Sequence, residues 1–146
     1  MIRLEMNMNT ANERETGLTK DSGWQAGVRR TLPVKPEAAW DFLLSPDAVR
    51  IWLGAAPTLP LAHGAEFKLK DGTRCKITIL KPGSHIRMQW QPANYPKPAV
   101  LQVRVIPAAS GTTFSFHQEN LPDADARQQR IAFYENALEE LGKMKV

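Results

Sequence analysis

Hydrophobic and polar residues alternate with a period of two along six stretches of the chain. The stretches are residues 24–32, 66–70, 73–80, 85–90, 101–105 and 112–118. Such alternation is typical of β-strands that bury one face and expose the other. The dipeptides Asp71-Gly72, Pro82-Gly83 and Ser110-Gly111 separate consecutive stretches and are turn signals. We therefore predict a curved antiparallel sheet of about six strands, with one apolar face and one wet face.

Two short helices are predicted directly after the first strand. The segment Pro36–Leu44 repeats its apolar residues at helical spacing, with Trp40 and Leu43 on one face. Ser45 can cap a second helix at once, and Gly54 can end it. A kink between two short helices is therefore expected here.

The last predicted element is a helix of about twenty residues, which at 1.5 Å per residue spans about 30 Å. Asp123 and Asp125 suit its N-terminus, where the helix dipole favours negative charge, and Gly142 closes it. Its apolar stripe consists of Ile131, Tyr134, Leu138 and Leu141, widened by Phe133 and Ala137. A helix of this length can cross a whole sheet, so we expect it to cover the apolar face.

The inward phases of the strands and the helix stripe predict one hydrophobic core. In the stretch 73–80, Cys75, Ile77 and Ile79 share the apolar phase, and a buried cysteine behaves as a small, inert hydrophobe. Residues 1–23 are polar and predict a poorly structured lead-in, so the domain is expected to span residues 24–146. The expected core contains Val28, Ile77, Met88, Val103, Phe114, Phe116, Leu138 and Leu141.

Composition narrows the class of protein. The chain of 146 residues fits one domain, and its single cysteine excludes an intramolecular disulfide framework. No stretch is long and apolar enough for a signal peptide or a membrane span, so we expect a cytoplasmic protein that does not insert into membranes. The net charge of +4 comes from basic residues scattered over the polar strand phases. No nucleic-acid recognition motif accompanies them, so the pattern argues against nucleic acid as a partner.

The order of the predicted elements resembles the START-like superfamily, also called SRPBCC, helix-grip or Bet v 1-like. Within it, the chain resembles the AHSA1-type domains, named for an activator of Hsp90 ATPase, over about residues 24–144. The resemblance rests on these motifs: Pro36-x-x-x-Trp40, Ser45-Pro46 followed by Trp52-Leu53-Gly54, Asp71-Gly72-Thr73, Pro82-Gly83 ahead of Ile86-x-x-x-Trp90, and His117-x-x-x-Leu121-Pro122-Asp123.

This resemblance implies an α+β fold with a deep apolar cavity between the sheet and the C-terminal helix, and it implies no reaction. We therefore expect non-enzymatic binding of a small hydrophobic ligand, as a carrier or sensor, without a cofactor. Two alternatives stay open. One is a co-chaperone-like module that meets a protein partner through its basic face, and the other is a cavity-based enzyme of the cyclase or hydrolase type.

Six side chains are candidates for the lining of such a cavity. Two tryptophans lie at the ends of elements where this fold opens its cavity, and Tyr134 brings a hydroxyl into an apolar stripe. Arg30 is a charged residue in the apolar phase of the first strand, so it either anchors an anionic ligand or is turned outward by a twist or bulge. The six candidates are Trp52, Trp90, Tyr134, Arg30, Met88 and Phe116.

The sequence contains no nucleophile elbow, phosphate loop or cysteine–histidine arrangement that indicates an enzyme. For acid–base chemistry the available groups are His117, Glu119 and Tyr134. His117 and Glu119 share one face of a predicted strand, and such a pair is far more often solvated than part of a metal site. We therefore expect neither a catalytic residue nor a metal site.

Overall fold

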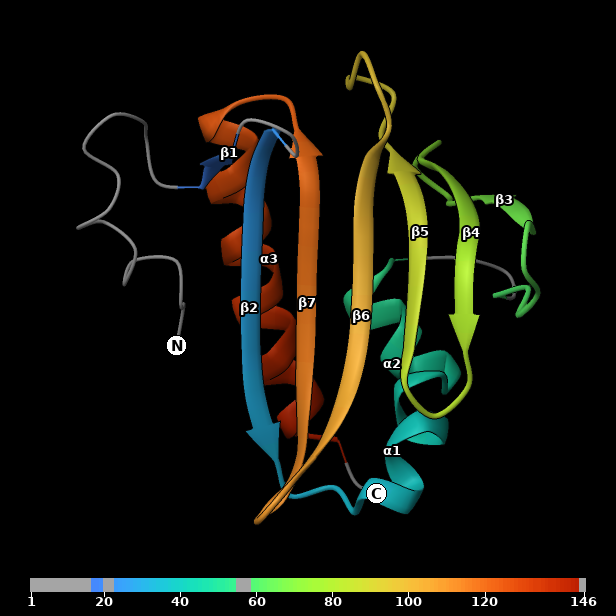
Figure 1. Ribbon diagram of the computed structural model, residues 1–146, viewed down its shortest axis with the longest axis vertical. Coiled ribbons are helices and arrows are strands. Elements are labelled where there is room, and N and C mark those ends of the chain that lie inside the picture. Colours follow the sequence, from blue (N-terminus) through green and yellow to red (C-terminus); the bar gives the residue numbers. More distant parts are fainter. Residues whose placement is uncertain (1–16, 20–22, 55–58, 145–146) are drawn as a thin grey trace.

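The computed structural model describes residues 17–19, 23–54 and 59–144, and within them seven strands form one antiparallel sheet with three helices against one face (Figure 1). The strand order is β1-β2-β7-β6-β5-β4-β3. The helices are α1 (Pro36–Leu43), α2 (Pro46–Trp52) and α3 (Ala124–Gly142). The strands are β1 (Leu18–Thr19), β2 (Gly23–Leu32), β3 (Glu66–Lys68), β4 (Arg74–Lys81), β5 (His85–Gln91), β6 (Ala99–Ala108) and β7 (Gly111–Leu121).

The predicted fold class is confirmed, and the sheet has one further strand at its edge that was not predicted. Leu18 pairs with Trp24, so the pair Leu18–Thr19 forms a two-residue strand inside the stretch predicted as a lead-in. The remainder of that prediction, residues 1–16 and 20–22, lies outside the described residues.

The strand phases place the predicted core on the helix side of the sheet. All eight expected core residues are buried, which confirms that set. Ile79 is a correction, because it is 37% exposed. The register of β4 against β5 shifts between Ile77 and Ile79, and this irregularity turns Ile79 out of the apolar phase that Ile77 and Cys75 keep.

The two short helices follow β2 as predicted, with the expected cap between them. The Ser45 hydroxyl accepts a hydrogen bond from the Ala48 N–H, and its carbonyl accepts another from the Val49 N–H. On α1 the predicted Leu43 is buried, but Trp40 is only half-buried, and Phe42, which was not part of the predicted face, is buried. Phe42 packs on Phe114 of β7 with ring centroids 5.6 Å apart, and this contact fixes the rotation of the helix.

Helix α3 runs lengthwise behind β2 and β7 (Figure 1) and contacts both strands. The Asp123 carboxylate caps it by accepting a hydrogen bond from the Ala126 N–H at 2.8 Å. Its predicted stripe of Ile131, Tyr134, Leu138 and Leu141 is buried, and of the two residues that widen it Ala137 is buried and Phe133 half-buried, which confirms the side of α3 that faces the sheet. No helix in the described part of the chain is both long and apolar enough to cross a membrane.

Candidate ligand-binding site between the sheet and α3

An arginine on the second turn of α3 lies among three aromatic rings. The Cζ atom of Arg130 lies 4.2 Å from the ring centroid of Trp90 and 4.3 Å from that of Phe133. It lies 4.9 Å from the ring centroid of Tyr134, one helical turn further along α3. A guanidinium at these distances interacts favourably with the negative faces of the rings. The contacts therefore join the C-terminal helix to the end of β5.

Two hydrogen bonds fix the orientation of the guanidinium. Arg130 Nε donates to Gln118 Oε1 of β7 at 2.8 Å, and Arg130 Nη2 donates to the Tyr134 hydroxyl at 2.9 Å. Burial raises the pKa of Tyr134, which the charge and the hydrogen bond of Arg130 lower in part. Tyr134 is therefore neutral at physiological pH. Its hydroxyl is bonded to Arg130, and its ring packs on Phe116 in the core.

The amide of Gln118 is buried and only half satisfied. Gln118 has no exposed surface, and its Nε2 has no hydrogen-bond partner in the described structure. Because an arginine can only donate, the atom that faces Arg130 Nε must be the amide oxygen. The NH2 group is thereby left with its donors unused. A buried donor in this state is costly in most folds, which marks this position as unusual.

Aromatic rings form a row from α2 to the loop between β5 and β6. Trp52 and Phe116 have ring centroids 6.0 Å apart, and Phe116 stacks on Tyr134 at 4.8 Å. Beyond Arg130, Trp90 meets Tyr95 edge-on at 5.6 Å. The exposed fraction is 0% at Trp52 and Phe116, 1% at Tyr134, 5% at Trp90 and 9% at Tyr95. The row therefore approaches the surface at the end that holds Trp90 and Tyr95.

Three of the predicted lining residues lie in the tightly packed part of the core. Trp52, Met88 and Phe116 have no surface that a water-sized probe reaches, so no void of that size borders them in this structure. The indole N–H of Trp52 donates to the Leu43 carbonyl at 2.9 Å and is thus satisfied without a ligand. A role of these three in ligand binding stays a prediction.

Arg30 keeps to the helix side of β2, since it lies directly opposite the buried Phe114 in the register of β2 with β7. It lies apart from the aromatic cluster, a name we use for Arg130, Gln118 and the rings of Trp90, Phe133, Tyr134 and Tyr95. Arg30 Nη1 lies 3.4 Å from Glu139 Oε1 of α3, in a pair whose side chains are 36% and 59% exposed. Glu139 is nine residues beyond Arg130, or roughly 13 Å along the helix. Arg30 is therefore paired at the sheet edge, far from Trp90 and Tyr95.

Cys75 lies directly opposite Trp90 in the register of β4 with β5 and is buried. Burial raises the pKa of its thiol to about 12, with a smaller contribution from the charge of Asp71. A thiol with this pKa is about 10⁻⁴ ionised at pH 8, whereas a free cysteine thiol, with a pKa of about 8.5, is about one quarter ionised.

We therefore expect a thiol reagent such as DTNB to label Cys75 at least a hundredfold more slowly in the native protein than in the urea-unfolded protein. Because Cys75 is the single cysteine, the absorbance of the released thiolate reports this site alone. Equal rates in the two states would show that the strand pair β4–β5 opens freely near Trp90.

The candidate acid–base groups do not share one site. His117 and Glu119 lie on the outer face of the sheet, where His117 Nε2 lies 3.0 Å from Gln25 Oε1 and Arg87 Nη2 lies 3.1 Å from Glu119 Oε1. Tyr134 packs on the opposite, inner face against Phe116. The sheet therefore separates the hydroxyl from the imidazole and the carboxylate. Among the described residues, no three histidine, cysteine or acidic side chains gather as a metal site would require.

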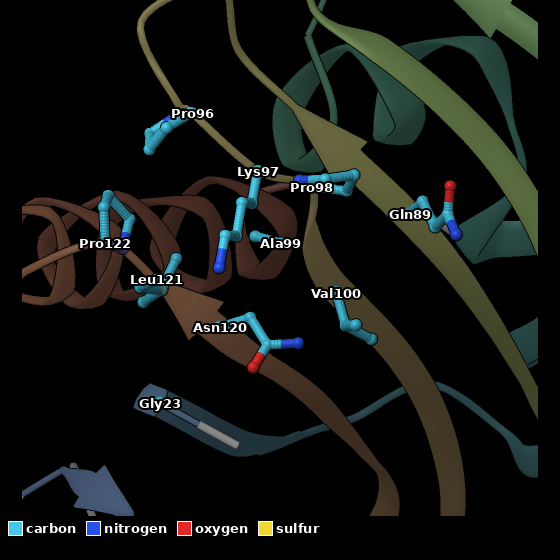
Figure 2. Close-up of a pocket in the computed structure, with 10 residues that line it drawn as sticks. All are labelled: Gly23, Gln89, Pro96, Lys97, Pro98, Ala99, Val100, Asn120, Leu121 and Pro122. Atoms are coloured by element: carbon cyan, nitrogen blue, oxygen red, sulfur yellow. The ribbon is translucent and has the colours of Figure 1, made fainter. Parts of the chain in front are cut away.

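One concavity of the structure is not lined by the rings around Arg130. It is an open groove of about 650 Å³ between the β5–β6 loop and the adjoining ends of β2 and β7 (Figure 2). Asn120 takes a left-handed conformation there, with φ of 61°, where the register of β2 against β7 shifts. None of the six predicted site residues lines this groove. Its lining residues are Gly23, Gln89, Pro96, Lys97, Pro98, Ala99, Val100, Asn120, Leu121 and Pro122.

Two polar residues of the aromatic cluster, Gln118 and Arg130, were not predicted, although the sequence carries a signal for each. Gln118 continues the inward phase of Phe114 and Phe116 along β7, so its burial follows from the alternation. Arg130 precedes Tyr134 by four residues and thus lies on the same helix face. Tyr95 lies in a loop without periodicity, and the alternation gives no information on its position.

Comparison with known proteins agrees with this fold. The family model for activator of Hsp90 ATPase homolog 1-like proteins matches residues 33–145. The solved structure of MLL2253 from Mesorhizobium loti is 21% identical with a TM-score of 0.68, covering 82% of this chain and 94% of that one. CalU16 from Micromonospora echinospora is 18% identical with a TM-score of 0.70, covering 85% and 76%.

DynU16, a protein of the dynemicin biosynthetic locus, is 14% identical with a TM-score of 0.70, and the match covers 82% of this chain and 46% of DynU16. No curated protein matches the chain at a significant level. The identities to the solved structures are low enough that they show a shared fold alone. The family match covers most of the chain and agrees with the observed order of strands and helices, so this protein belongs to the activator of Hsp90 ATPase homolog 1-like family.

Proposed function

We propose that the protein binds a small, largely apolar molecule between the sheet and α3, as a carrier or sensor and without catalysing a reaction. The observation that carries this proposal is the row of aromatic rings whose exposure rises toward Trp90 and Tyr95. Flat rings that approach the surface offer stacking area for a ligand, and pockets for small molecules are typically lined in this way. The fully buried rings of the row, Trp52, Phe116 and Tyr134, form a rigid support behind the end of the row where the ligand would bind.

Entry of a ligand requires a side chain to move, because the rings around Arg130 are already in contact with it. Arg130 and Phe133 are the half-buried members of the cluster, and a long arginine side chain changes rotamer readily. We therefore place the ligand beside Trp90 and Tyr95, with the guanidinium moving outward as the ligand enters and returning to Gln118 and Tyr134 once the ligand is bound. The separation of His117 and Glu119 from Tyr134 supports binding over catalysis.

The proposal predicts that a panel of lipids, aromatic metabolites and polyketide-like compounds contains molecules that stabilise the folded protein. A ligand that binds only the folded state adds about 2.7 kcal/mol of stability at 100 times its dissociation constant. A thermal-shift screen measures this, and tryptophan emission reports whether the compound reaches Trp90. In the variant Trp90→Phe, the same compounds should still stabilise the protein while the change in emission falls.

A matched control is Trp24→Phe, because Trp24 lies at the start of β2 and is not one of the three rings that surround Arg130 in the described structure. This variant should keep both the stabilisation and the change in emission. The proposal is contradicted if no compound raises the melting temperature, or if stabilising compounds change the emission equally in Trp90→Phe and the wild type.

A further inference from the structure

Resting on the proposed function, we infer that the ligand carries a carboxylate, which Arg130 and the amide of Gln118 bind while its ring system stacks on Trp90. Two independent observations lead to this chemical class. Among the described residues, one is a half-buried cation without an ion-pair partner, and the other is a fully buried amide with unused donors beside it.

The charge of Arg130 is not neutralised by contact within the described part of the chain. The ion pairs found there join Arg30, Arg50, Arg87, His117 and Lys143 to acidic residues, and Arg130 is absent from them. Asp71 is a carboxylate whose charge interacts with Arg130, and it does so from beyond contact distance. The rings of Trp90, Phe133 and Tyr134 partly compensate the positive charge of the guanidinium. Their faces cannot replace the oxygen acceptors that the N–H groups need in the plane of the guanidinium.

The remaining N–H groups of Arg130 are available to an acceptor. Nε and one Nη2 hydrogen donate to Gln118 and Tyr134, and a guanidinium has five N–H groups in a planar fork. A carboxylate matches two parallel donors of such a fork, which is the geometry in which arginine recognises acids. Half-burial of the side chain leaves this edge within reach of a ligand entering from the surface.

Gln118 adds a third donor at the same place. Its Oε1 is held by Arg130 Nε, and its unpartnered Nε2 belongs to the same planar amide, so the NH2 group lies beside the guanidinium. A buried NH2 group without an acceptor favours a ligand that brings one. An acid is thus preferred over an amine, because the Gln118 NH2 group and the remaining N–H groups of Arg130 are all donors.

The test uses matched sets of acid, methyl ester and hydrocarbon on several skeletons, for example 2-naphthoate, methyl 2-naphthoate and 2-methylnaphthalene, with benzene, anthracene and decyl analogues. Isothermal titration calorimetry on the full chain measures each dissociation constant. For the skeleton that binds best, we expect the acid to bind on the order of tenfold or more tightly than its ester, as charge-assisted hydrogen bonds provide.

The decisive variant is Gln118→Glu, which differs by one group from the wild type. The new carboxylate keeps the acceptor for Arg130 Nε, removes the free NH2 donor and neutralises the arginine. We expect the tenfold advantage of the acid over its ester to disappear in this variant. Arg130→Gln should have the same effect, and Arg130→Lys, which keeps the charge, should retain part of the advantage.

Arg29→Gln is the matched control, since Arg29 is an exposed arginine of β2 opposite Ser115 on the outer face. It should leave the ratio of acid to ester affinity unchanged. If esters or hydrocarbons bind but the acid is no tighter, or if the advantage survives in Gln118→Glu and Arg130→Gln, the carboxylate inference is wrong and the binding function stands. If no skeleton binds in any form, the proposed function itself is wrong and the inference falls with it.

Discussion

Phe116→Ala is expected to lower the free energy of unfolding by about 3–5 kcal/mol, as deletion of a buried aromatic ring does when the site cannot collapse. Phe116 has no exposed surface and stacks on Tyr134 with an interplanar angle of 10°. It also contacts Trp52, whose position is fixed by its bond to Leu43. These rigid neighbours leave an unfilled space. Urea denaturation followed by circular dichroism measures the loss.

Phe67→Ala serves as the control for this substitution. Phe67 lies on the three-residue edge strand β3 and is half-buried, so its truncation leaves a gap that water can fill. We expect a loss less than half of that at Phe116. A loss below about 1 kcal/mol at Phe116, where a packed core predicts several times more, would mean that the space between Trp52 and Tyr134 is loosely packed or already hollow.

Gly111→Ala is expected to destabilise the protein by about 2–5 kcal/mol, because it combines backbone strain with overpacking. Gly111 follows the two-residue turn between β6 and β7 and has a φ of 149°, a region that residues with a Cβ rarely adopt. A Cβ at this position would meet the carbonyl oxygen of Leu32 at the end of β2. That oxygen belongs to the backbone and cannot swing away.

Gly83→Ala separates the two causes. Gly83 also has a positive φ, of 81°, but a Cβ there has no neighbour within 4 Å. We expect a loss of about 1–2 kcal/mol from the left-handed conformation alone. Thermal and urea denaturation of both variants give the comparison. Equal losses at Gly83 and Gly111 would contradict the contact between the β6–β7 turn and the end of β2.

The fold could be predicted from the sequence because its signals are local. Alternation along each strand fixes which side chains face the helices, and this is why Val28 and Val103 were placed in the core correctly. Ser45 and Asp123 act as N-caps because each hydroxyl or carboxylate bonds to an N–H three residues further on. Because such contacts join residues only a few positions apart, they can be predicted from the sequence.

The sequence misplaces residues where one strand slips against another. The alternation assigns Ile79 to the buried phase, and the register shift between β4 and β5 places it on the outside. A shift of one residue reverses every side chain that follows it. Its position depends on how two strands pair, and no pattern within either strand specifies it.

The candidate site depended on tertiary structure for a similar reason. The sequence alone determined that the domain has an apolar sheet face, a long helix across it and an arginine in an inward strand phase. It selected Arg30, which lies at the sheet edge and pairs with Glu139. Arg130 became the central residue because folding brings Trp90, forty residues earlier, within 4.2 Å of its guanidinium. Whether a charged side chain meets a carboxylate or an aromatic ring depends on contacts between distant segments, which only the packed fold creates.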